Sequence, residues 1–105
     1  MGVTYVPVAR VGEIKPGEVK PIELGGREAL LVENGGNYYV CDRLCPHEGV
    51  DLRTGVVEQA QIRCANHGYR FDLATGACTM PPGGPPLTVL PVEIRGEEIC
   101  VKLEW

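Results

Sequence analysis

The N-terminal part of the chain alternates apolar and polar residues over short stretches, which are separated by glycine, proline and asparagine. A period of two is typical of β-strands with one buried face, and the separating residues are those that tight turns require. The pattern predicts a meander of antiparallel strands over residues 4–14, 19–24, 27–33 and 38–41. Pro7 lies in the first strand, so we expect that strand at a sheet edge, where a missing N–H is tolerated.

The C-terminal residues repeat this pattern. Residues 87–95 and 97–103 flank Gly96 and predict a hairpin that completes the sheet begun by the N-terminal strands. In the last strand one apolar set alternates with a second set, which predicts a single buried face. The apolar set is Ile99, Val101 and Leu103, and the second set is Glu98, Cys100 and Lys102.

The middle of the chain has a different character. Residues 55–62 form a bridging segment, and residues 69–79 predict a small hairpin around Gly76. Residues 80–86 read Met-Pro-Pro-Gly-Gly-Pro-Pro, which is typical of a semi-rigid linker. No stretch shows a sustained period of 3.6 residues, so we expect an all-β chain.

Size and charge limit the possible functions. With 105 residues the chain is one domain, and 14 glycines and 9 prolines favour many turns over long helices. The net charge of −4 argues against nucleic acid as a partner. No apolar run approaches the roughly 18 residues of a transmembrane helix, and the first residues do not resemble a signal peptide. We therefore expect no membrane partner.

Candidate chemistry is concentrated in two short motifs. Cys45-Pro46-His47 and Cys64-Ala65-Asn66-His67 each pair one thiol with one imidazole, and they contain both histidines of the chain. Two cysteines and two histidines suit either a tetrahedral zinc or a [2Fe–2S] cluster. A structural zinc usually takes two cysteines in one arm and two histidines in the other. The mixed arms here favour the two-iron cluster.

The arms C-P-H-E-G and C-A-N-H-G-Y-R-F-D resemble those of the Rieske iron–sulfur family. The resemblance implies that Cys45 and Cys64 bind one iron while His47 and His67 bind the other. It also implies a Rieske fold over residues 1–105. In that fold an antiparallel β-sandwich base (about 1–41 and 87–105) carries an inserted cluster-binding subdomain (about 42–86).

Within this family the chain is most similar to the small ferredoxins of biphenyl-type ring-hydroxylating dioxygenase systems. The resemblance implies a one-electron carrier, not an enzyme, with a flavin-dependent ferredoxin reductase and a terminal oxygenase as partners. A catalytic oxygenase subunit would need a second iron site with two more histidines, and this chain has none left. Rieske subunits of membrane complexes carry an N-terminal anchor, whereas this chain lacks one, so we expect a cytoplasmic protein.

Two alternatives remain open at this stage. One is the small subunit of a nitrite-reductase-type complex, whose members often lack the ligands. The other is a zinc-stabilised or redox-responsive interaction module. The remaining cysteines, Cys41, Cys78 and Cys100, are expected to be free thiols, because intracellular disulfides are rare.

The resemblance carries three further expectations. Residues 80–86 would form a stiff lid over the cluster. Glu48, Asn66 and Tyr69 would surround the histidines where partners dock. High-potential relatives join the two loops by a disulfide and donate serine and tyrosine hydroxyls to the sulfurs. The corresponding positions here are Val50, Asn66, Tyr69 and Phe71, so we expect a potential at the low end, about −150 mV, and nearly flat around pH 7.

Overall fold

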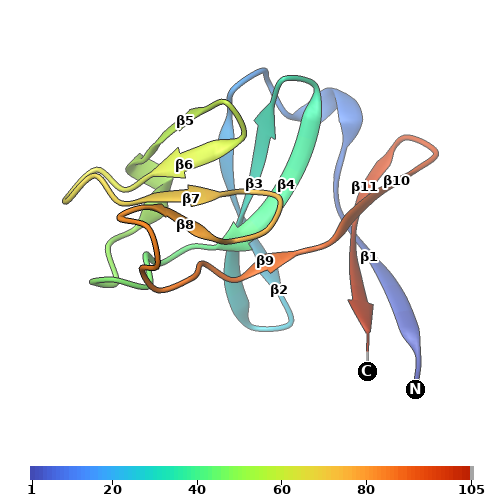
Figure 1. The fold of residues 1–105 in the computed structure, drawn as a ribbon. Helices are drawn as coiled ribbons and strands as arrows, with labels where there is room; N and C mark the ends of the chain where they lie inside the picture. Colours follow the sequence, from blue (N-terminus) through green and yellow to red (C-terminus); the bar gives the residue numbers. More distant parts are fainter. Residues whose placement is uncertain (105) are drawn as a thin grey trace.

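The computed structural model describes residues 1–104, so Trp105, the last residue of the expected base, lies outside the described part. Strands and two short 3-10 helices make up the regular structure of the described residues, which confirms the all-β class (Figure 1). None of its helices is long and apolar enough to cross a membrane. The elements are β1 (Val3–Arg10), η1 (Val11–Glu13), β2 (Val19–Leu24), β3 (Arg27–Asn34), β4 (Asn37–Asp42), η2 (Leu52–Thr54), β5 (Val56–Glu58), β6 (Gln61–Arg63), β7 (Arg70–Asp72), β8 (Cys78–Met80), β9 (Val89–Leu90), β10 (Val92–Arg95) and β11 (Glu98–Glu104).

The strands form three antiparallel sheets. The terminal sheet has the order β1-β11-β10, the middle sheet β2-β3-β4-β9, and the small sheet β5-β6-β7-β8. Figure 1 shows the middle sheet between the other two, with the small sheet at the left of the view and the terminal sheet at the right. The antiparallel pairing expected from the sequence is confirmed.

The middle sheet is buried on both faces. Along β3, Leu30 and Val32 point into a core shared with the small sheet, whereas Ala29 and Leu31 point into a core shared with the terminal sheet. Successive side chains of a strand point to opposite faces, so one strand serves both cores. We call these the small-sheet core and the terminal core.

The terminal sheet keeps β1 at its edge, as Pro7 predicts. The register with β11 shifts between Pro7 and Ala9, where the proline interrupts regular pairing. The strand is shorter than expected, because a 3-10 turn begins at Val11. Oε1 of Glu13 accepts a hydrogen bond from the backbone N–H of Arg10 (2.7 Å) and stabilises that turn.

The predicted strand over residues 87–95 was wrong. Pro91 divides it into β9, which pairs with β4 in the middle sheet, and β10, which pairs with β11 in the terminal sheet. Proline has no N–H to continue a ladder, although its carbonyl accepts from the N–H of Lys102 (2.9 Å). The C-terminal strands do pair with N-terminal strands, as expected, but in two sheets instead of one. β9 joins β4 in the middle sheet, and the β10–β11 hairpin joins β1 in the terminal sheet. Cys100 is only 2% exposed, so the single buried face expected for β11 was also wrong at this position.

The bridging segment over residues 55–62 contains a hairpin that the sequence pattern did not predict. β5 and β6 pair through a turn in which Gln59 and Ala60 have φ values of 53° and 58°. Turns of this kind usually reveal themselves through Asn-Gly or Asp-Gly, and neither residue here is of that type. Oδ1 of Asn34, in the middle sheet, accepts from the N–H of Ala60 (2.7 Å) and holds this turn.

Candidate metal centre

The first ligand loop, residues 45–50, connects β4 to η2 and is closed by its own backbone. The N–H of Cys45 donates to the carbonyl of Val50 (2.8 Å), and the N–H of Gly49 donates to the carbonyl of Cys45 (2.7 Å). Gly49 has a φ of 72°, in the left-handed region that glycine adopts without strain. The loop thus returns on itself and presents His47 at its tip.

The second ligand loop, residues 64–69, connects β6 to β7 and repeats this architecture. The N–H of Cys64 donates to the carbonyl of Tyr69 (2.8 Å), and the N–H of Gly68 donates to the carbonyl of Cys64 (3.1 Å). Gly68 has a φ of 73°, almost identical to its counterpart in the first loop. The two loops therefore share one backbone frame, although the histidine follows the cysteine at a different spacing in each.

The two thiols lie inside the protein. Cys45 and Cys64 are 2% and 3% exposed and belong to the small-sheet core. Burial raises the pKa of the Cys45 thiol, the backbone N–H groups of His47 and Glu48 lower that pKa, and the neighbouring Cys64 raises it again. Those N–H groups would stabilise negative charge on the sulfur once it binds a metal.

The two imidazoles lie at the surface. The side chains of His47 and His67 are 32% and 49% exposed, and their ring centroids are 5.5 Å apart at an angle of 80°. The structure thus brings the two thiols together inside the protein and the two imidazoles together at its surface. Among residues 1–104, no group of three or more cysteine, histidine or acidic side chains surrounds a single metal position. A donor set of two adjacent buried thiols and two surface imidazoles fits a two-iron cluster in which each iron takes one pair.

Three neighbours of the histidines make contacts that the sequence pattern did not reveal. Oε2 of Glu48 lies 2.9 Å from Nε2 of His67 and accepts a hydrogen bond from Nδ2 of Asn66 (2.9 Å). The ring of Tyr69 stacks on that of His47, with centroids 4.0 Å apart and an angle of 8°. The sequence suggested these residues only as a docking surface, because nothing in it indicated which loop each would reach.

Residues 80–86 begin at the last residue of β8 and lead toward β9, at the same end of the molecule as the two ligand loops (Figure 1). Sγ of Cys78 donates to the carbonyl of Pro81 (3.2 Å), and the N–H of Leu87 donates to the carbonyl of Gly76 (2.8 Å). A Cβ at Gly76 would collide with the carbonyl oxygen of Leu87, so glycine permits this close approach. The proline-rich segment is therefore anchored at both ends to the hairpin that carries the second loop.

All five cysteines are free thiols and all are buried. Cys41 lies on β4 with no exposed surface. Burial, followed by the negative charge of Asp42, raises the pKa of its thiol to about 12. Such a thiol stays protonated at neutral pH and packs as a small apolar side chain.

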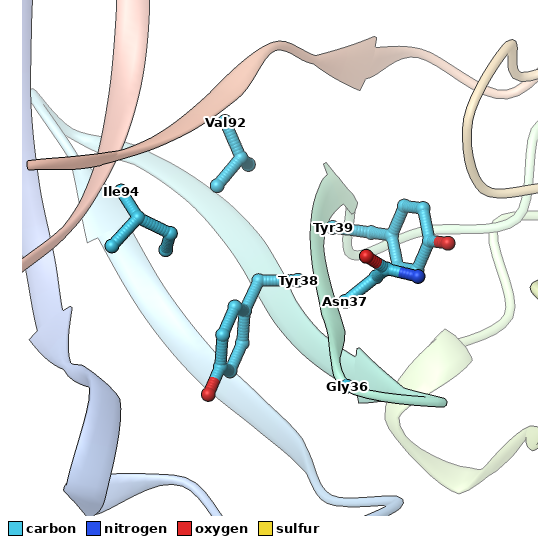
Figure 2. A pocket seen from close by; sticks show the side chains of 6 residues that line it. All are labelled: Gly36, Asn37, Tyr38, Tyr39, Val92 and Ile94. Carbon is cyan, nitrogen blue, oxygen red and sulfur yellow. The ribbon is translucent and has the colours of Figure 1, made fainter.

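A groove of about 420 Å³ lies where β4 meets β10. Figure 2 shows Tyr38 of β4 beside Val92 and Ile94 of β10, with Gly36, Asn37 and Tyr39 along its border. None of the four candidate ligands lines it. The candidate ligands therefore lie outside this groove.

Known proteins resemble this chain in sequence. The family model for the Rieske [2Fe-2S] domain matches residues 4–91. The ferredoxin component of the naphthalene 1,2-dioxygenase/salicylate 5-hydroxylase systems of Ralstonia sp. is 30% identical over 104 residues, which cover 99% of this chain and 100% of that protein. Apoptosis-inducing factor 3 of Mus musculus is 32% identical over 95 residues, and this chain spans only 16% of its length.

Solved structures resemble it in fold. The ferredoxin of carbazole 1,9a-dioxygenase from Nocardioides aromaticivorans IC177 superposes with a TM-score of 0.85 at 35% identity, covering 93% of this chain and 96% of that one. A chain from the complex of reduced oxygenase and oxidized ferredoxin in carbazole 1,9a-dioxygenase gives a TM-score of 0.82 at 26% identity, covering 92% and 91%. From the family match and these full-length similarities, the chain belongs to the Rieske [2Fe-2S] domain family.

Proposed function

We propose that this protein is a one-electron carrier that passes electrons from a flavin-dependent ferredoxin reductase to the terminal oxygenase of a ring-hydroxylating dioxygenase system. One observation carries the proposal: two loops with the same backbone frame place two thiols inside the protein and two imidazoles at its surface. The full-length similarity to dioxygenase ferredoxins supports the partner class. We also propose an aromatic compound of the biphenyl kind as the substrate of the pathway. The similarity to ferredoxins of naphthalene and carbazole dioxygenases supports the aromatic class.

We assign Cys45 and Cys64 to the inner iron and His47 and His67 to the outer iron. A [2Fe–2S] cluster bound there would accept and release one electron at a time. Because Cys45 and Cys64 are buried, their sulfur atoms are shielded from water and oxidants. The exposed imidazoles form the point at which a partner comes closest, and residues 80–86 act as a lid beside them.

The chain divides into two parts. We propose residues 1–41 and 87–105 as the base and residues 42–86 as the cluster-binding subdomain, because the small sheet and both ligand loops lie within the latter segment. The free state of all five cysteines supports a reducing compartment, for which we propose the cytoplasm.

The purified protein tests this proposal directly. Its visible and electron paramagnetic resonance spectra should be those of a Rieske cluster, with about two irons and two sulfides per chain. The variants His47→Ala and His67→Ala should each lose or alter this spectrum. A wild-type resonance spectrum without the signature of histidine ligands would contradict the ligand assignment. A colourless protein with stoichiometric zinc would exclude electron transfer. Reduction by a flavin reductase and reoxidation by an oxygenase then test the partners.

A further inference from the structure

The two ligand loops are tied to one another by side chains, and each tie runs from one loop to the histidine of the other. Glu48 of the first loop reaches Nε2 of His67 in the second, at 2.9 Å. Tyr69 of the second loop stacks on His47 of the first, with ring centroids 4.0 Å apart and nearly parallel planes. Neither contact follows from the backbone frame within a loop.

Glu48 also connects the loops a second time. Its Oε2 accepts a hydrogen bond from Nδ2 of Asn66 (2.9 Å). The same carboxylate oxygen therefore contacts both Asn66 and His67 of the second loop. Its Oε1 lies 4.0 Å from Nδ1 of His47. The carboxylate is therefore engaged within the protein, although its side chain is 42% exposed. Because Glu48 contacts Nε2 of His67, Nδ1 would be the ring nitrogen left free to hold a metal.

We propose that Glu48 and Tyr69 form a reciprocal clasp, which holds each histidine in place from the opposite loop and keeps the two loops together. The clasp stands where a covalent tie is absent, since all cysteines are free and Val50 and Asn66 cannot form a disulfide. Both are positioning residues that act through the histidines, so the inference rests on the proposed ligand set.

The two ties act in parallel, so removing both should have a different effect from the combined effects of removing each one alone. When one tie is removed, the other still restrains the loops. When both are removed, no contact from Glu48 or Tyr69 restrains the opposite histidine, and only the edge contact between the two imidazoles remains at the tips. The acceleration of cluster loss on removing both contacts should therefore exceed the product of the accelerations caused by the two single removals. Two contacts that merely supported their own neighbours would instead give independent effects.

The test uses the cluster-loaded protein and measures the rate at which visible absorbance disappears in the presence of an iron chelator. Glu48→Ala and Tyr69→Leu should each accelerate the loss about fivefold, given the usual strength of a partly exposed polar pair and of an aromatic stack. If the two contacts were independent, the double variant would lose its cluster about 25-fold faster, which is the product of the single effects. Because the contacts act in parallel, we expect a larger acceleration than this. Both single variants should also shift the resonance spectrum of the reduced cluster.

Conservative and remote variants serve as controls. Tyr69→Phe keeps the stack and Glu48→Gln keeps an acceptor for Asn66 and His67, so both should stay close to the wild type. Glu97→Ala removes a carboxylate that is ion-paired with Arg10 in the terminal sheet, and Tyr38→Leu removes a tyrosine of the middle sheet. Neither control should change the rate or the spectrum.

The outcomes separate the clasp from the proposed function. A wild-type protein without a Rieske spectrum would overturn the proposed function and the clasp with it. A normal wild-type spectrum, with single variants that lose the cluster at the wild-type rate or a double variant that matches the product, would overturn the clasp alone. If Glu48→Ala never loads a cluster while Glu48→Gln loads normally, the clasp is supported, since only the contact differs.

Discussion

The two cores of this molecule lie on opposite faces of one sheet, and they are built differently. The terminal core is aliphatic, and its buried members come chiefly from the long strands β3, β4 and β11. The small-sheet core contains four of the five cysteines, and many of its other members come from three-residue strands and connecting loops. The terminal core holds Ile14, Ala29, Leu31, Val40, Ile99 and Val101; the small-sheet core holds Leu30, Val32, Cys41, Cys45, Leu52, Ile62, Cys64, Phe71, Leu73, Cys78 and Leu87.

This difference indicates that the two regions are stabilised in different ways. Long paired strands with aliphatic faces gain their stability from apolar burial, which needs no cofactor. Strands of three residues supply few ladder hydrogen bonds and little surface, so the small sheet depends more on what its loops bind. We expect the terminal core to persist without the cluster and the ligand loops to depend on it.

Removing the cluster should produce the largest effect. In the apoprotein, the amides of Cys45, Gly49, Cys64 and Gly68 should lose protection from hydrogen exchange by at least about a hundredfold, because binding energy of ~2.7 kcal/mol or more is lost locally. The amides of β3 and β11 should keep most of their protection. Exchange measured on holo- and apoprotein by mass spectrometry checks this, and equal losses in both regions would show that the two cores unfold as one.

The reduction potential should differ strongly from that of high-potential relatives. Phe71 lies fully buried in the small-sheet core and offers no hydrogen bond. The sequence resemblance places it at the position of the tyrosine that donates to a sulfur in high-potential relatives. Fewer donors leave more charge on the sulfurs and disfavour reduction, so we expect a midpoint of about −150 mV, nearly independent of pH around neutrality. Voltammetry from neutral to alkaline pH measures both properties. A midpoint above roughly +100 mV at pH 7 would contradict this reading of the core.

Two adjacent residues of β3 provide a matched comparison of the cores. Leu30 and Leu31 are both fully buried, but Leu30 points into the small-sheet core and Leu31 into the terminal core. Replacing either by alanine should lower the free energy of unfolding by about 2–5 kcal/mol. Only Leu30→Ala should also accelerate cluster loss well below the unfolding midpoint. Chemical denaturation and chelator-driven bleaching measure the two effects, and equal bleaching in both variants would mean that the cores are not separate.

How far the sequence could predict this structure also differs between the regions. The alternation of apolar and polar residues, together with the turn residues, was sufficient to predict β2, β3 and β4. The cysteine–histidine motifs were sufficient to identify the candidate ligands. The β5–β6 hairpin stayed hidden, because its turn uses Gln59 and Ala60 in the left-handed region and depends on Asn34 for support. The contacts from Glu48 and Tyr69 to the opposite loop arise only when distant segments meet, so no local pattern could reveal them.

The smallest effect concerns a thiol that belongs to the small-sheet core without being a candidate ligand. Burial raises the pKa of Cys41 from its ordinary value of 9.0 to about 12, so the folded protein holds this proton more tightly than the unfolded chain does. The resulting stability is fully present below pH 9 and is lost as the pH rises toward 12, by about 1.4 kcal/mol per pH unit. Cys41→Ala should therefore be less stable than the wild type at pH 7, because of the cavity it leaves, but should lose less stability between pH 9 and 10. Urea unfolding of both proteins at pH 7, 9 and 10 measures the difference. Parallel losses in the two proteins would show that the thiol reaches solvent before unfolding, and that the small-sheet core opens more readily than its burial indicates.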